Sequence, residues 1–150
     1  MSWRPISLTD LFSEMTDNEV ALLKNIQSTP DSDKLTGLLE KVVRAARGAI
    51  QAGGNSVDLD ETLLPDQVIS DVIAIARWKW LTSFPVLKAF QTDARKTAAD
   101  DAQKRLDTMA NTGRPKVEPP QNPSGTISLV NSPSFGQRTR NFTTTNQDGI

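Results

Sequence analysis

Three short acidic clusters are the places where this sequence could bind a cation or perform acid–base chemistry. They are Asp31 with Asp33, the run of Asp58, Asp60 and Glu61, and Asp100 with Asp101. An EF-hand calcium loop needs oxygen ligands at positions 1, 3 and 5, glycine at position 6 and glutamate at position 12. Counting from Asp31 or from Asp58, the later positions hold other residue types. We therefore interpret the clusters as helix-start carboxylates or solvated loops.

The other residue types restrict the chemistry further. The 150 residues include no cysteine and no histidine, so thiol nucleophiles, thiolate ligands, disulfides and imidazole bases are excluded. The segment QAGGN, residues 51–55, has no Walker lysine and follows a predicted helix rather than a strand. We predict no catalytic residue, no bound metal and no cofactor, and we interpret the chain as a protein that is not an enzyme.

The stretch ARWKWLTSFP, residues 76–85, contains two of the three tryptophans. At about 100° per residue, Trp80 falls on the apolar stripe of residues 68–76, whereas Trp78 points away from it and Ile75 lies near Trp78. Two apolar faces indicate burial on two sides, and we expect so small a body to cover one by itself. The second face is predicted to meet another subunit or the returning tail. We favour a partner interface for Trp78; ordinary core packing is the main alternative, followed by exposure or ligand contact, and base stacking is disfavoured.

Apolar residues with a helical period predict a helical body. We predict a short helix after Ser7, a helix opened by a capping box of Thr16 and Glu19, a long helix from 31–33 to Gly53, a helix over 65–84, and a last helix from about Ala99 that ends at Gly113. In the long helix, Lys41, Arg44 and Arg47 fall mostly opposite the apolar stripe. The predicted fold is all-α, a small bundle of four to five helices with a long extended C-terminal tail.

The composition changes after Gly113, which divides the chain into a body, 1–113, and a tail, 114–150. The tail is rich in Pro, Gly, Ser, Thr and Asn, so it cannot form a core of its own. Its segment TISLV, residues 126–130, alternates like a short strand and could join a neighbour's sheet edge. We predict that the tail contacts partners; a disordered terminus is the alternative. The apolar residues assigned to partner interfaces are Ile75, Trp78, Phe84, Phe90, Val117, Ile127, Leu129, Val130, Phe135 and Phe142.

Charge and hydropathy predict a soluble chain. The formal net charge is −1 and hydrophobic residues make up 37% of the sequence. Near-neutral charge gives no bulk attraction to nucleic acid or to an anionic membrane. No apolar run is long enough to span a bilayer, and the N-terminus MSWRPISLTD has no signal-peptide core. We expect no membrane partner and no export by that route.

The helix order resembles that of the small helical head–tail connector, or adaptor, proteins of tailed phages, in particular the Mu-like prophage connector family. The likeness covers about residues 5–113 and includes the segments DVIAIARW and AQKRLDTMA. The resemblance implies a homo-oligomeric ring, dodecameric in such proteins, beneath a portal protein in the virion neck and assembled in the host cytoplasm. It also implies contact with the next neck or tail-completion protein and a channel through which DNA passes without sequence recognition.

A small nucleic-acid-binding module associated with packaged DNA is the alternative function. Its support is a set of basic residues in two predicted helices, namely Arg77, Lys79, Arg95, Lys96, Lys104 and Arg105. Neighbouring acidic residues offset these charges, so we prefer the adaptor.

Overall fold

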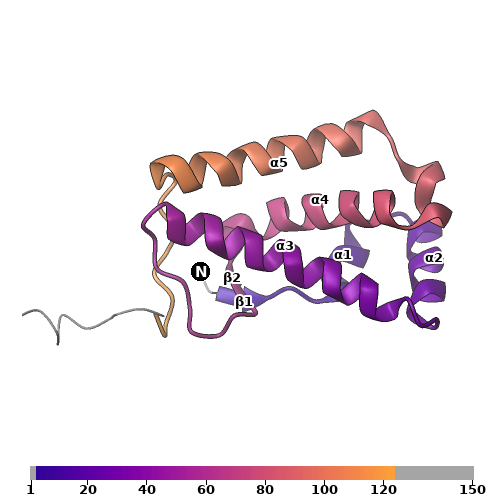
Figure 1. The fold of residues 1–150 in the computed structure, drawn as a ribbon, viewed down its shortest axis with the longest axis horizontal. Coiled ribbons are helices and arrows are strands. Elements are labelled where there is room, and N and C mark those ends of the chain that lie inside the picture. The colour runs from indigo at the N-terminus through magenta and orange to yellow at the C-terminus, as the bar shows by residue number, and fades with distance from the viewer. Residues whose placement is uncertain (1–2, 124–150) are drawn as a thin grey trace, which may run out of the picture.

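Helices account for most of the fold in a computed structural model that describes residues 3–123 (Figure 1). The elements are β1 (Trp3–Pro5), α1 (Leu8–Ser13), α2 (Asp17–Gln27), α3 (Ser32–Ala52), β2 (Leu63–Pro65), α4 (Asp66–Ser83), the 3₁₀-helix η1 (Pro85–Phe90) and α5 (Asp93–Thr112). This confirms the all-α class. The predicted strand over 126–130 lies outside the described residues. None of the helices within residues 3–123 is long and apolar enough to cross a membrane.

Helix α4 lies at the centre of the bundle and packs against both α3 and α5 (Figure 1). Trp80 is fully buried, as its spacing predicts, and its indole Nε1–H donates to the Leu35 carbonyl of α3 at 3.1 Å. Ile75 is 6% exposed and adjoins residues of α3 and α5. The chain's own α5 thus covers part of the second apolar face of α4, the face for which the sequence predicts another subunit or the tail.

Local signals set several helix ends as predicted. Ser7 precedes α1, and its backbone N–H donates to the carboxylate of Asp10 at 2.8 Å. Thr16 is the N-cap of α2. Gly113 ends α5 with φ of 67°, a left-handed conformation that glycine adopts without strain. Helix α5 begins at Asp93, earlier than expected, because the Thr92 hydroxyl caps it by accepting from the Arg95 backbone N–H.

The short sheet is absent from the sequence-based prediction. Strands β1 and β2 pair antiparallel, with Trp3 opposite Pro65 and Pro5 opposite Leu63. Three-residue strands that contain proline have almost no local signature, because their pairing partner is far away in the sequence. The pairing places the N-terminal segment against the start of α4.

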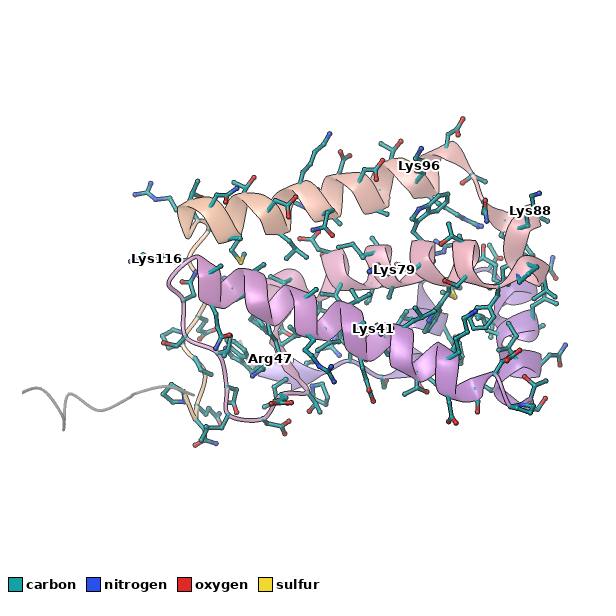
Figure 2. The ribbon with its side chains drawn as sticks, in the orientation of Figure 1. Lys41, Arg47, Lys79, Lys88, Lys96 and Lys116 are labelled. Carbon is teal, nitrogen blue, oxygen red and sulfur yellow. The ribbon has the colours of Figure 1, made fainter. Side chains whose placement is uncertain are left out.

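Arg47 corrects the prediction that it lies on the solvent side of the long helix. Its residue is 7% exposed, and its guanidinium donates to the backbone carbonyls of Asp58 and Leu63 (Figure 2). Asp58 is only 3% exposed, and its carboxylate accepts from the backbone N–H groups of Asp60 and Asn122. Asp58, one member of the acidic run, is therefore buried, and its hydrogen bonds hold the loop over 53–62 in place.

The first part of the predicted tail packs on the body. Val117 is 8% exposed, and its backbone N–H donates to Asn55 at 3.4 Å. The Trp3 indole donates to the Glu118 carbonyl at 2.9 Å, and the Leu59 N–H donates to the Asn122 carbonyl at 2.8 Å. The packed region thus continues to residue 123, ten residues beyond the composition change at Gly113.

Two glycines allow the C-terminal ends of α3 and α5 to touch. A Cβ on Gly53 would lie 2.2 Å from the Met109 carbonyl oxygen, and a Cβ on Gly113 would lie 2.3 Å from the Gly53 carbonyl oxygen. Both distances are too short for any side chain, so the backbones can approach this closely only with glycine at both positions.

Replacing either glycine with alanine should therefore loosen this contact. We expect Gly53→Ala and Gly113→Ala each to lower the free energy of unfolding by about 2 kcal/mol or more, because backbone must move. Gly48→Ala is the matched control. It lies in α3, where a Cβ would meet no other atom within 4 Å, and should raise stability by roughly 0.5–1 kcal/mol. Denaturant titration measures all three; a neutral Gly53→Ala would contradict the close approach.

Candidate functional site

The structure divides the predicted interface residues into three groups. Ile75, Phe84 and Val117 are 6%, 4% and 8% exposed, so these side chains pack within the chain itself. This corrects their assignment to a partner surface, because a side chain enclosed by its own fold has little area left to bury. Trp78 and Phe90 are half-buried. The remaining five, Ile127, Leu129, Val130, Phe135 and Phe142, lie outside the described residues.

A groove runs along the part of α4 that α5 leaves open. It consists of two adjoining pockets of about 460 and 250 Å³ that share Ala74 and Arg77. The wider part is lined by Arg4, Glu14, Asp66, Ile69, Ser70, Ile73, Ala74 and Arg77. The narrower part is lined by Ala74, Arg77, Trp78, Ala94, Arg95 and Ala98. We call the two parts together the α4 groove.

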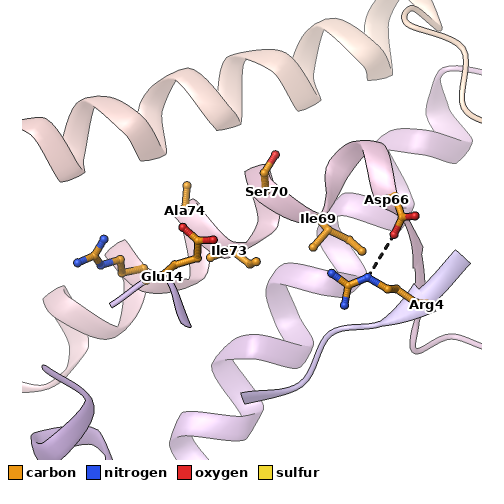
Figure 3. A pocket seen from close by; sticks show the side chains of 8 residues that line it. Arg4, Glu14, Asp66, Ile69, Ser70, Ile73 and Ala74 are labelled. Carbon is orange, nitrogen blue, oxygen red and sulfur yellow. Dashed lines mark hydrogen bonds and ion pairs between the residues drawn. The ribbon is translucent and has the colours of Figure 1, made fainter. Parts of the chain in front are cut away.

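The wider part has an apolar floor and a charged rim. Figure 3 shows Ile69, Ile73 and Ala74 along α4, with Arg4 of β1 at one end and Glu14 at the other, while α5 passes beside them. The Arg4 guanidinium bridges Asp10 and Asp66, each at 3.2 Å. Both pairs are partly exposed, so they orient side chains more than they stabilise the fold.

The narrower part is organised by a buried carboxylate. Glu19 of α2 is fully buried, and both of its oxygens accept from the Arg77 guanidinium of α4 at 2.9 and 3.0 Å. Arg95 of α5 pairs with the same carboxylate and also donates to the Phe90 carbonyl. Two cations share one anion here, which gives this cluster a net charge of +1. The arginine side chains are 20% and 19% exposed and line the groove.

The sequence does not predict this cluster, because the position of Glu19 in the sequence fits a different role. Glu19 lies three residues after Thr16, which indicates a capping box, and the predicted reciprocal side-chain bonds do not form. Two guanidiniums bind a carboxylate more strongly than one backbone N–H does, so Glu19 turns inward instead. Arg77 and Arg95 are 58 and 76 positions away along the chain, and no local pattern connects them to Glu19.

The basic residues that supported the nucleic-acid alternative are not gathered into one track. Arg77 and Arg95 are paired with Glu19, and Arg105 is paired with Asp71 at 2.6 Å. That hydrogen bond raises the pKa of the Arg105 guanidinium above its already high ordinary value. Figure 2 shows the labelled lysines spread over α3, α4, η1, α5 and the segment after α5. This distribution does not favour a continuous phosphate-binding surface.

Within residues 3–123, no group of three or more carboxylates is arranged to hold a metal ion. No family model, curated protein or solved structure matches this chain. The α4 groove is therefore assigned from geometry. Its apolar floor, its half-buried tryptophan and its net positive end suit the docking of a protein segment.

Removing the charge of Glu19 tests whether this cluster holds three helices together. Glu19→Gln keeps the side-chain shape but leaves two guanidiniums without their anion, so we expect the free energy of unfolding to fall by about 3 kcal/mol. Arg4→Gln is the control at an exposed pair and should cost less than about 1 kcal/mol. Denaturant melts measure both. Equal, small losses would show that the carboxylate does not organise the bundle.

Acid should weaken the attachment of α1 through Asp10. The Ser7 backbone N–H holds the pKa of Asp10 below its ordinary value, with the Ser7 hydroxyl and Arg4 acting in the same direction. A depressed folded-state pKa adds stability above the unfolded-state pKa and loses it as pH falls through the folded value, so the loss begins below about pH 4. Asp10→Asn should cost about 1 kcal/mol at pH 7 and flatten this acid limb. Carboxyl NMR titration that placed Asp10 at or above its ordinary pKa would contradict this.

Proposed function

We propose that this chain is a structural adaptor, a head–tail connector that assembles as a ring beneath a portal protein and joins a phage capsid to its tail. The observation that carries the proposal is the α4 groove, an open apolar strip with a half-buried tryptophan on the central helix. The helix order on which the resemblance to the connector family rests, two short helices, a long helix and then two further helices, adds support.

Assembly rather than catalysis is the mechanism. A groove on one side of a subunit that receives a different surface of the next makes a head-to-tail contact, which closes into a ring when the rotation between copies allows it. Trp78 would anchor such a contact, because tryptophans that become buried carry much of the binding energy of interfaces. The two arginines beside it would orient an incoming acidic group.

The residues after 123 would supply the contacts to other neck components. Residues 124–150 can reach up to ~90 Å if fully extended, at ~3.3 Å per residue. This reach is enough for the portal protein on one side or for the next neck or tail-completion protein on the other. DNA would pass through the ring's channel without sequence recognition.

Blocking the groove should prevent assembly without unfolding the subunit. Ser70 is exposed in the wider part, so Ser70→Arg places a bulky cation there and should reduce ring formation at least about tenfold, with a melting temperature near that of the wild type. Trp78→Ala should likewise weaken assembly more than folding. Thr108→Arg, at an exposed position of α5 outside the groove, is the control. Light scattering and thermal melts measure the two effects.

Two results would oppose the adaptor. One is equal loss of assembly and of folding in Trp78→Ala. The other is a wild-type chain that stays monomeric when mixed with portal and neck proteins. Salt-dependent affinity of the isolated chain for duplex DNA would favour the nucleic-acid module instead.

A further inference from the structure

The loop before β2 exposes a leucine on a fixed piece of backbone. Within residues 3–123, the large hydrophobic side chains that are strongly exposed are those of Leu59 and Val86. The Leu59 backbone N–H donates to the Asn122 carbonyl at 2.8 Å. Arg47 and Asp58, which hold the same loop, are buried and opposite in charge. The Leu59 side chain is therefore held at the surface, where it can contact another molecule.

The surface beside Leu59 carries a net negative charge. Asp60 and Glu61 are both exposed, and Arg44 of α3, which lines the same hollow as Glu61, offsets one of the two charges. Two carboxylates and one guanidinium give this surface a net charge of −1. The hydroxyl and the backbone N–H of Thr62 hold the pKa of Asp60 below its ordinary value, so this carboxylate is ionised at neutral pH. We call Leu59, Asp60 and Glu61 the loop tip.

The narrow part of the α4 groove is complementary to the loop tip. Its volume is about 250 Å³, and Trp78 and three alanines give it an apolar lining. Arg77 and Arg95 complete the lining, and together with the Glu19 carboxylate they carry a net charge of +1. An aliphatic side chain can therefore enter this pocket while the carboxylates beside it approach the two arginines.

Charge distinguishes the two exposed hydrophobic side chains as occupants of this pocket. Val86 lies in η1, two residues before Lys88, and no carboxylate lies within five residues of it in the sequence. Bringing Lys88 toward the net positive Glu19 cluster is unfavourable, whereas the loop tip brings a net negative charge to it. Leu59 is therefore the occupant that fits in both shape and charge.

We propose that the loop tip of one copy of this chain inserts Leu59 into the narrow part of the α4 groove of a second copy. The inference rests on the proposed adaptor function, for which it names the surface that each subunit offers to the next. The loop over 53–62 and the Glu19 cluster lie at opposite ends of the bundle (Figure 1), so a chain cannot fill its own pocket. Each copy has one loop tip and one pocket, and such contacts continue from copy to copy until a ring closes.

Replacing the two exposed hydrophobic side chains tests the choice of occupant. Leu59→Asp removes the apolar anchor, so the protein concentration at half-assembly should rise at least about tenfold, because burial of a leucine is worth that much in affinity. Val86→Asp is the matched control and should leave this concentration unchanged. Light scattering measures assembly, and circular dichroism checks folding. Equal effects of the two variants, or a larger effect of Val86→Asp, would overturn the proposal.

Charge reversal tests the electrostatic part of the contact. Glu61→Lys changes the loop tip from −1 to +1, so it should raise the concentration at half-assembly, and by more at low salt than at high salt. Asp107→Lys makes the same change in net charge at an exposed position of α5 outside the pocket, and should have a smaller effect. Equal effects would show that only the net charge of the chain matters, which contradicts the pairing.

Mixing two defective variants tests whether the loop tip of one copy meets the pocket of another. Leu59→Asp keeps an intact pocket, whereas Ala98→Arg, at an exposed position that lines the pocket, keeps an intact loop tip. We expect each variant alone to stay monomeric and the mixture to give a one-to-one heterodimer that does not grow further. Analytical ultracentrifugation measures the masses. A mixture that stays monomeric would overturn the proposal.

Failure of this contact and failure of the adaptor function give different results. If the wild type forms rings and Leu59→Asp forms them equally well, the contact is wrong and the adaptor stands. If the wild type stops at a reciprocal dimer that Leu59→Asp abolishes, the contact stands and the ring is wrong. A wild-type chain that stays monomeric alone at about 1 mM would overturn the contact, whereas the adaptor is tested with portal and neck proteins present.

Discussion

The buried carboxylate of Glu19 is the constraint on which the arrangement of the bundle depends. Removing a carboxylate from water costs several kcal/mol, and the cost is offset only by close, well-oriented partners. Here the partners come from α4 and α5, so α2 can pack in only one place relative to both helices. The same pairing fixes the two arginines along the groove. A group that stabilises the fold therefore also sets the charge at one end of the candidate interface.

Local physics explains why much of the fold is predictable. The apolar period of α3, the cap at Ser7, the left-handed glycine at Gly113 and the burial of Trp80 all depend on residues near one another in sequence. The residues that the sequence analysis places wrongly depend on contacts with distant parts of the chain. Glu19 and Arg47 are polar residues whose partners are distant in the sequence. The neighbouring residues suggest another role for each, a capping box for Glu19 and a solvent-facing position for Arg47. A polar side chain turns inward only when the tertiary fold brings it a partner, which a single local pattern does not encode.

For the second apolar face of α4, the sequence correctly predicts burial but does not predict that another helix of the same chain covers part of it. Two-sided apolarity correctly indicates two-sided burial, but α5 supplies part of the cover. Among residues 3–123, the only large hydrophobic side chains that are strongly exposed are Leu59 and Val86, at 66% and 59%. Association of this chain would therefore depend on a defined groove and on half-buried side chains such as Trp78, rather than on a broad apolar patch.

The narrow part of the α4 groove and the described part of the tail lie at opposite ends of the bundle. The Glu19 cluster and Trp78 lie toward the end of the bundle that carries α2 and η1, while residues 114–123 run along the opposite end, beside the loop over 53–62 (Figure 1). A neighbour seated at the narrow part of the α4 groove would not meet the point where the described tail ends. A contact at this narrow part would therefore not compete with residues 114–123 for the same surface. Because Arg47 and Asp58 anchor the loop over 53–62, and Asp58 also bonds to Asn122, the folded body itself holds residue 122 in place.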